Sequence, residues 1–156
     1  MGMFEWLENS PVAIWVGESL WAYPFWLSLH AVGLAIVVGV FAMRDFKLLG
    51  MFDGIDATAF LPVIKFAWAG FAINAISGFF LFTSQASFFV TSKPFLIKIS
   101  FIFVAAILAA VTQNKLRVAL AAGPEFAPGA SVKVIAALSL TLWFGAVVAG
   151  RLIAYL

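Results

Sequence analysis

Cysteine is absent from the sequence, histidine occurs once, and charged residues make up only 10% of the 156 positions. Without cysteine the chain forms no disulfide, no thiolate metal site and no iron–sulfur cluster. The scarcity of charge excludes an ordinary soluble domain, in which about 25% of the residues are charged. The nine basic and seven acidic residues give a formal charge of +2, too weak a bias to indicate nucleic acid as a partner.

Hydrophobic residues account for 65% of the chain, and the mean hydropathy is +1.12. A small soluble fold cannot bury that much apolar surface, because a large fraction of its residues stays in contact with water. The same richness in apolar residues excludes intrinsic disorder. The composition therefore predicts an integral membrane protein surrounded by membrane lipids.

Four apolar stretches reach the about 20 residues that a helix needs to cross a hydrocarbon core of about 30 Å. They cover approximately residues 23–43, 60–82, 94–114 and 131–154. Before them, Ser10 and Pro11 form a typical helix start within residues 1–20, and we expect a short helix there, lying at the membrane interface. The predicted fold class is all-α: a single membrane domain over residues 1–156, built as a four-helix bundle with a short N-terminal interfacial helix.

The basic residues outside the spans predict the orientation of the bundle. Five of them flank the first and third loops, and one lies in the second loop; they are Arg44, Lys47, Lys115, Arg117 and Lys133 against Lys93. Because cytoplasmic loops carry an excess of lysine and arginine, we expect the first and third loops in the cytoplasm. Both termini would then be periplasmic, in a bacterial inner membrane.

The charges just after the first span are interpreted as loop residues. Arg44 suits the negative end of one helix dipole and Asp56 the positive start of the next, and docking of a partner is the alternative. With Asp45 also assigned to this loop, no acidic residue is expected inside a span. That absence argues against the proton relay of a pump or antiporter.

Each predicted span carries one strongly polar candidate in the half of the membrane nearer the termini: His30, Asn74, Lys98 and Arg151. Each is a candidate functional residue because a polar group in lipid is costly. Simpler roles exist for each. Lys98 and Arg151 could extend to the headgroups, Asn74 could join two helices, and His30 could hydrogen-bond a neighbouring helix.

The surroundings of His30 favour a ligand. Gly33 lies three residues further on the same helix face and leaves space beside the imidazole, either for a flat ligand or for a close helix crossing. A neutral imidazole in a four-helix bundle is a good axial ligand for haem iron. Lys98 and Arg151 would hold the two propionates, and Asn74 would orient the site. We therefore expect haem b as the cofactor, with His30 as its only histidine ligand in one chain.

Small residues also repeat every four positions on the first span, at Ala31, Ala35 and Gly39. This spacing is typical of closely packed membrane helices. It predicts a contact within the bundle or, alternatively, with a second copy of the chain or a partner membrane subunit.

The segment WLSLHAVGLAIVVGVFAMRDFKLLGM, from Trp26 to Met51, resembles a family of small, uncharacterised four-helix proteins of bacterial inner membranes. Their shared features are an SLH-x-x-G-L-A run and, at the cytoplasmic end of the helix, a D-x-K-L-L-G motif. KPFLIK, from Lys93 to Lys98, is similar to the start of their third helix. This resemblance covers most of the chain and implies the same four-helix fold.

Two remoter likenesses bear on function. A histidine early in the first helix and a lysine early in the third resemble the J-type protoporphyrinogen oxidases, whose histidine ligates haem b and whose lysine is needed for activity. His30 and Lys98 stand at the matching positions. LHAVG is similar to the copper-resistance D-type membrane domain. The likenesses imply a haem-b protein acting in electron transfer or porphyrin-linked oxidation, with a periplasmic redox partner. The alternatives are a non-catalytic subunit or scaffold of a larger complex and periplasmic copper handling or transport.

Overall fold

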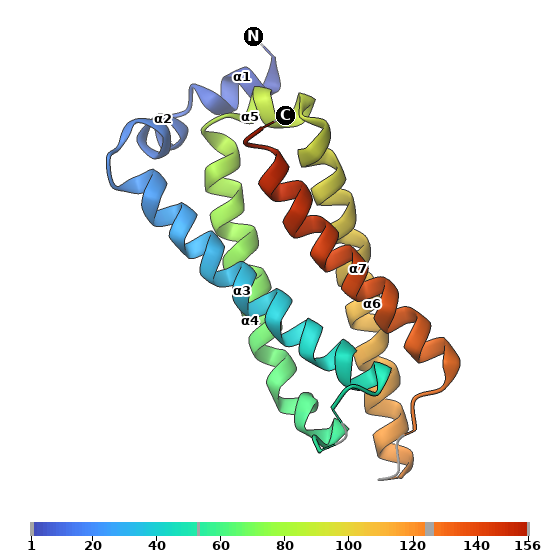
Figure 1. Cartoon of the computed structure of the whole chain (residues 1–156). Helices are drawn as coiled ribbons and strands as arrows, with labels where there is room; N and C mark the ends of the chain where they lie inside the picture. Colours follow the sequence, from blue (N-terminus) through green and yellow to red (C-terminus); the bar gives the residue numbers. More distant parts are fainter. Residues whose placement is uncertain (1, 53, 124–126, 156) are drawn as a thin grey trace.

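The computed structural model describes residues 2–52, 54–123 and 127–155, and these residues form helices without any strand (Figure 1). The four long helices are α3 (Ala22–Leu49), α4 (Phe60–Thr83), α6 (Lys93–Ala122) and α7 (Ala130–Leu152). Each of them is long and apolar enough to cross a membrane. The predicted all-α bundle of a multi-pass membrane protein is thus confirmed.

Shorter elements lie at the two ends of the bundle. They are α1 (Met3–Glu8), α2 (Pro11–Glu18), the 3-10 turn η1 (Ala57–Ala59) and α5 (Ala86–Thr91). Figure 1 shows α1 and α5 at the same end as both chain termini, and we call this the terminal end. The opposite end, where α3 connects to α4 and α6 to α7, is the loop end. The predicted start of α2 is confirmed, because Ser10 Oγ accepts a hydrogen bond from the Ala13 amide at 3.3 Å.

Small residues allow the long helices to pack closely in two pairs. In the α3–α4 pair, a Cβ atom added to Gly33 would lie 2.8 Å from the backbone nitrogen of Asn74 and 2.9 Å from the carbonyl oxygen of Gly70. In the α6–α7 pair, a Cβ atom added to Gly145 would lie 2.7 Å from the ring of Phe101. Close approach at small residues is how membrane helices gain packing contacts, since lipid offers no hydrophobic driving force between them.

Apolar side chains from all four long helices fill the middle of the bundle. This central apolar layer consists of Val37, Phe41, Ile64, Ala67, Ala105, Ala109 and Trp143. Its largest members, Phe41 and Trp143, are stacked with ring centroids 5.4 Å apart. Many large apolar side chains also cover the outside of the helices, as expected for a protein whose solvent is lipid.

The loop-end half of α3 corrects two sequence predictions. α3 continues past residue 43 to Leu49, and it ends at Gly50, whose φ of +93° supplies the left-handed backbone of a helix cap. Arg44 and Asp45 are therefore not loop residues: both are fully buried in the bundle and form an ion pair. The prediction that no acidic residue lies inside a span is wrong, because pairing with Arg44 offsets much of the cost of burying the Asp45 charge. α6 likewise runs on beyond residue 114, to Ala122.

The small-residue spacing on α3 is not used inside the bundle. Ala31, Ala35 and Gly39 are all exposed, and no atom lies within 4 Å of the position that a Cβ atom on Gly39 would take. The prediction of a contact within the bundle is wrong for this ladder, because the face of α3 that meets α4 carries Gly33 instead. The equivalent spacing on α6 does pack internally, since Ala105 and Ala109 are fully buried.

Candidate functional site

Three adjoining cavities near the terminal end bring the predicted polar residues together. Their volumes are about 530, 310 and 410 Å³, within the roughly 300–1,000 Å³ typical of ligand pockets. His30 and Lys98 line all three cavities, while Arg151 and Asn74 each line two of them. Four side chains far apart in the sequence, from α3, α4, α6 and α7, therefore surround one hollow region of the bundle.

The His30 imidazole is held through one of its ring nitrogens. Nδ1 lies 2.9 Å from the backbone oxygen of Asn74 and 3.2 Å from Oγ of Ser77. Because a carbonyl oxygen only accepts, the Asn74 bond requires the proton on Nδ1. The neutral ring then carries its lone pair on Nε2, which makes no hydrogen bond within the described part of the chain. An imidazole fixed in this way is oriented for ligation through Nε2.

Asn74 and Ser77 hold this arrangement from α4. The Asn74 side chain donates from Nδ2 to the backbone oxygen of His30 at 2.8 Å. The Ser77 hydroxyl lies 2.7 Å from the carbonyl oxygen of Ile73, to which it can donate. Asn74 thus joins α3 to α4, as one of the simpler interpretations of the sequence expected, and it also borders the cavity.

Gly33 has a different role from the one expected of a cofactor-binding residue. It is buried against the backbone of α4 and belongs to none of the three cavity walls. Of the two uses predicted for the space beside it, the structure shows the close helix crossing. The glycine that leaves room for the imidazole is Gly78, where an added Cβ atom would lie 3.0 Å from Cε1 of His30. Sequence reasoning missed Gly78 because it lies 48 residues away on another helix.

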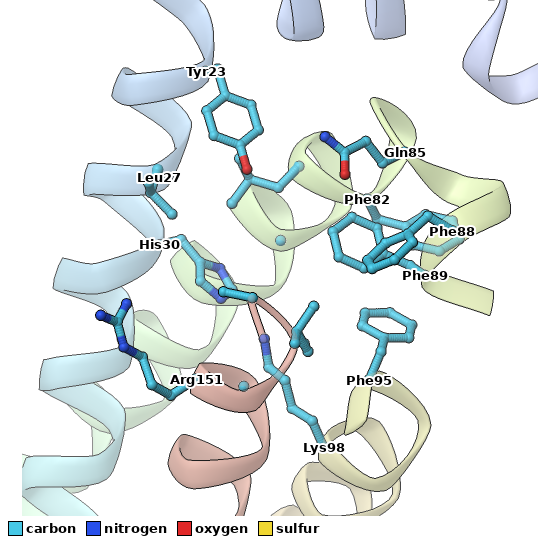
Figure 2. Close-up of a pocket in the computed structure, with 15 residues that line it drawn as sticks. Tyr23, Leu27, His30, Phe82, Gln85, Phe88, Phe89, Phe95, Lys98 and Arg151 are labelled. Atoms are coloured by element: carbon cyan, nitrogen blue, oxygen red, sulfur yellow. The ribbon is translucent and has the colours of Figure 1, made fainter. Parts of the chain in front are cut away.

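Two basic side chains enter the same region from α6 and α7. The Lys98 side chain runs beside Gly150 of α7, and an added Cβ atom there would lie 3.3 Å from Cδ of Lys98. Arg151 is exposed, with its guanidinium carbon 5.8 Å from the centre of the Tyr155 ring. Figure 2 shows the side chains of His30, Lys98 and Arg151 around the largest of the three cavities. This region therefore carries positive charge next to a neutral imidazole.

Aromatic rings form the wall opposite these polar groups (Figure 2). The rings of Phe82, Phe89 and Phe95 pack on one another with centroids 5.1–6.1 Å apart, and Phe88 packs against Phe89 at 5.6 Å. All four line the cavity of about 530 Å³. Flat apolar faces beside basic groups suit a ligand that is itself flat and apolar with anionic substituents. The sequence does not single out these rings, because phenylalanine is common throughout the spans.

Two short helices cover the terminal end next to the aromatic wall. The carboxylate of Glu8 in α1 accepts hydrogen bonds from the backbone amide and the hydroxyl of Ser87 in α5, at 2.9 and 2.8 Å. Phe4 of α1 packs edge-on against Phe82, with centroids 6.3 Å apart. These contacts tie the start of the chain to the connection between α4 and α6.

The site contains no chelating group for a bare metal ion. Within the described ranges, no three histidine, cysteine, aspartate or glutamate side chains lie together. Of these four residue types, only His30 is among the residues that line the three cavities. Comparison with protein-family models, with curated proteins and with solved structures finds no match to this chain.

Proposed function

We propose that this protein binds haem b in the membrane and acts in electron transfer or porphyrin-linked oxidation, with His30 as the axial ligand. The observation that carries the proposal is the 2.9 Å contact between Nδ1 of His30 and the backbone oxygen of Asn74, from which the tautomer of the ring is inferred. Its Nδ1 proton is committed to the Asn74 carbonyl, which leaves the Nε2 lone pair for iron. A histidine that only joined two helices would need no cavity beside it, yet His30 borders three.

The other cavity residues fit the remaining parts of the haem. The apolar macrocycle suits the wall of phenylalanine rings, and the two propionates suit Lys98 and Arg151. When bound, the haem supplies an iron centre that exchanges single electrons. The chain itself supplies orientation of the imidazole, charge neutralisation at the propionates and exclusion of water by the aromatic wall.

We further propose a bacterial inner-membrane location with both termini on the periplasmic side. Since Arg44 is buried, it no longer counts towards the orientation. Of the basic residues counted for the orientation, four remain near the loop end and one near the terminal end: Lys47, Lys115, Arg117 and Lys133 against Lys93. Lys65, Lys98 and Arg151 lie inside the ends of spans and are not counted. The excess at the loop end supports a cytoplasmic position for that end. The cavity then lies in the periplasmic half, within reach of a periplasmic redox partner.

The decisive experiment compares haem content after purification in detergent from cells supplied with excess haem. We expect the wild-type protein to give a reduced-minus-oxidised spectrum of the b type and close to one haem per chain in a pyridine haemochrome assay. His30→Ala should remove the haem while the protein elutes at the same volume as wild type. Added imidazole should restore part of the spectrum, because it fills the space of the missing ring. A colourless wild-type protein would overturn the proposal.

A matched pair of variants tests the role of the basic residues. Lys98→Gln removes the charge at the cavity, whereas Lys93→Gln removes an exposed charge one turn earlier on the same helix and outside the three cavities. We expect haem affinity to fall at least about tenfold in Lys98→Gln, the loss of one charge-assisted hydrogen bond, and to stay unchanged in Lys93→Gln. Equal affinities in the two variants would exclude Lys98 from the site.

A non-catalytic membrane subunit is the second candidate, favoured by the exposed small residues Ala35 and Gly39, which continue the spacing of Ala31 at the cavity wall. Small residues facing lipid are positions where another helix can approach closely. This alternative expects a colourless protein that purifies with other membrane chains or as a homo-oligomer. Gly39→Leu would then release the partner, because the larger side chain blocks the close approach of a second helix.

A further inference from the structure

Another hollow lies between α6 and α7 near the terminal end, and we call it the α6–α7 groove. Its volume is about 800 Å³, within the range of ligand pockets. Its walls come from residues 91–101, which include the start of α6, and from residues 145–152 at the end of α7. The groove shares no lining residue with the three cavities around His30, so it is a separate site.

Most of the α6–α7 groove is apolar and faces the surrounding lipid. Ile97, Val148 and Leu152 line it, with exposures of 47%, 58% and 41%. Between Lys93 and Phe101, which stand at the two ends of its α6 wall, the helix rises about 12 Å at about 1.5 Å per residue. An apolar groove of this length suits part of an acyl chain.

The polar residues of the groove are gathered at one end, where α6 begins near the terminal end of the bundle (Figure 1). They are Thr91, Ser92 and Lys93. Lys93 is exposed, and it carries the only charge among the described residues that line the groove. A basic group at the membrane surface attracts anionic headgroups. The groove therefore complements a molecule with an anionic head and an apolar chain.

The start of α6 adds hydrogen-bond donors to this polar end. Ser92 is the N-cap of the helix, yet its side chain accepts no hydrogen bond from the first turn. The backbone amides of Lys93 and Phe95 have no hydrogen-bond partner in the described part of the chain. Free amides at the positive end of a helix dipole are suited to binding a phosphate group.

Ser92 independently indicates a ligand at this end. Its exposure is 9%, and its Oγ has no hydrogen-bond partner among the described residues. Buried hydroxyls in folded proteins are nearly always paired, with protein or with ordered water. Because Ser92 belongs to the wall of the groove, the oxygens of a bound phosphate would offer its hydroxyl an acceptor.

We propose that the α6–α7 groove binds a phospholipid, with its phosphate at the start of α6 and part of an acyl chain between α6 and α7. Lys93 and the free amides of the first turn hold the phosphate, while Ile97, Val148 and Leu152 contact the chain. A phospholipid supplies the anion and the apolar chain in one molecule, and this favours it over a neighbouring membrane helix. The inference does not depend on haem binding.

Native mass spectrometry of the full chain tests the contact with the phosphate. The delipidated protein in detergent is titrated with phosphatidylglycerol, or with diacylglycerol that has the same acyl chains and no phosphate. We expect phosphatidylglycerol to bind at least about fivefold more tightly, and Lys93→Gln to lower its affinity about fivefold, the effect of one lysine at a membrane surface. Lys133→Gln is the matched control, because Lys133 is an exposed lysine near the start of α7 and outside the groove. Neither Lys133→Gln nor Lys98→Gln should change the affinity.

A second pair of variants tests the position of the acyl chain. Val148→Trp fills the groove, whereas Val134→Trp places the same side chain on α7 outside it, and both valines are 58% exposed. We expect Val148→Trp to lower the affinity for both lipids severalfold and Val134→Trp to lower neither. Leu152→Trp provides the same comparison if Val148→Trp does not fold.

Four outcomes would overturn the proposal. Equal affinities for phosphatidylglycerol in Lys93→Gln and Lys133→Gln would remove the phosphate from the start of α6. Equal affinities in the two valine variants would remove the acyl chain from the groove. Displacement of phosphatidylglycerol by inorganic phosphate at the same concentration would identify free phosphate as the ligand. A dimer that Val148→Trp disrupts and Val134→Trp preserves would identify a second copy of the chain as the occupant.

Discussion

His30 and Asn74 each place their side chain on the other's backbone carbonyl, across the contact between α3 and α4. Nδ1 of His30 lies 2.9 Å from the oxygen of Asn74, and Nδ2 of Asn74 lies 2.8 Å from the oxygen of His30. The acceptor for the imidazole is therefore a backbone atom, which no substitution at residue 74 removes. A substitution at residue 74 can therefore weaken the attachment of α3 to α4 without removing the atom that orients the His30 ring.

Asn74→Ala should weaken the bundle without releasing the imidazole. The variant loses the bond to the His30 carbonyl, and interhelical hydrogen bonds of this kind contribute about 0.6 kcal/mol on average and up to about 1.7 kcal/mol. We expect a loss of about 1 kcal/mol in the free energy of unfolding, measured in mixed micelles, with haem content retained. Asn114→Ala, at an exposed position on α6, is the control and should change neither quantity. An equal loss in both variants would contradict the assigned bond.

Gly33→Ala should destabilise the protein, because the added Cβ atom would meet backbone atoms of α4 at 2.8–2.9 Å. Overpacking of this kind costs about 1–3 kcal/mol. Gly39→Ala is the matched control six residues along the same helix, where no atom lies within 4 Å of the new methyl group. Helix propensity alone predicts a gain of up to about 1 kcal/mol there. Thermal unfolding of the two variants should thus shift in opposite directions, and a similar shift in both would reject the close crossing.

Replacing Arg44 and replacing Asp45 should have non-additive effects on the free energy of unfolding. Removing one partner leaves an unpaired charge inside the bundle, so Arg44→Met and Asp45→Leu should each cost about 3–5 kcal/mol. The double variant carries no buried charge, and its loss should be well below the sum of the two single losses. A double-mutant cycle of unfolding free energies measures this coupling, and additive losses would mean that the pair contributes nothing as a pair.

Asp56 lies outside the membrane-spanning helices and should make the stability of the fold depend on pH. Its Oδ1 accepts from the Thr58 amide at 2.9 Å, and this bond lowers the pKa of the carboxyl below its ordinary value of 3.8. A lowered pKa in the folded state means stability that is present above pH 3.8 and lost as the pH falls through the folded value. Wild type should therefore unfold at a higher temperature than Asp56→Ala near neutral pH, with the difference shrinking below pH 3.8. Asp56→Asn keeps an oxygen for the same bond, and its advantage over Asp56→Ala should not vary with pH.

The course of the chain through the membrane is predictable from sequence, because a run of about 20 apolar residues has few other stable structures. The ends of the spans are less predictable. Arg44 and Asp45 look like the start of a loop, and only the fold shows that they neutralise each other inside the bundle. α1 and α5 are too short for a periodic pattern to reveal, and the hydrogen bonds between Glu8 and Ser87 that join them link residues 79 positions apart.

The candidate site is predictable in its types of residue and only partly in its arrangement. A lone histidine and two basic residues in apolar spans draw attention to His30, Lys98 and Arg151, since such groups are costly in lipid. The sequence does not show whether the space at Gly33 takes a ligand or a neighbouring helix, because either one can occupy the room left by the absent side chain. The contribution of Gly78 depends on how α3 crosses α4, which no local pattern specifies.

The pairing of the helices bears on what a bound ligand does to the bundle. The glycine contact of Gly33 lies within the α3–α4 hairpin, and that of Gly150 with Lys98 lies within the α6–α7 hairpin. The cavities take their walls from both hairpins, so they lie along a seam between two closely packed pairs of helices. A ligand in this seam would touch both pairs at once. It would therefore join them near the terminal end, as the stacked rings of Phe41 and Trp143 join them in the central apolar layer.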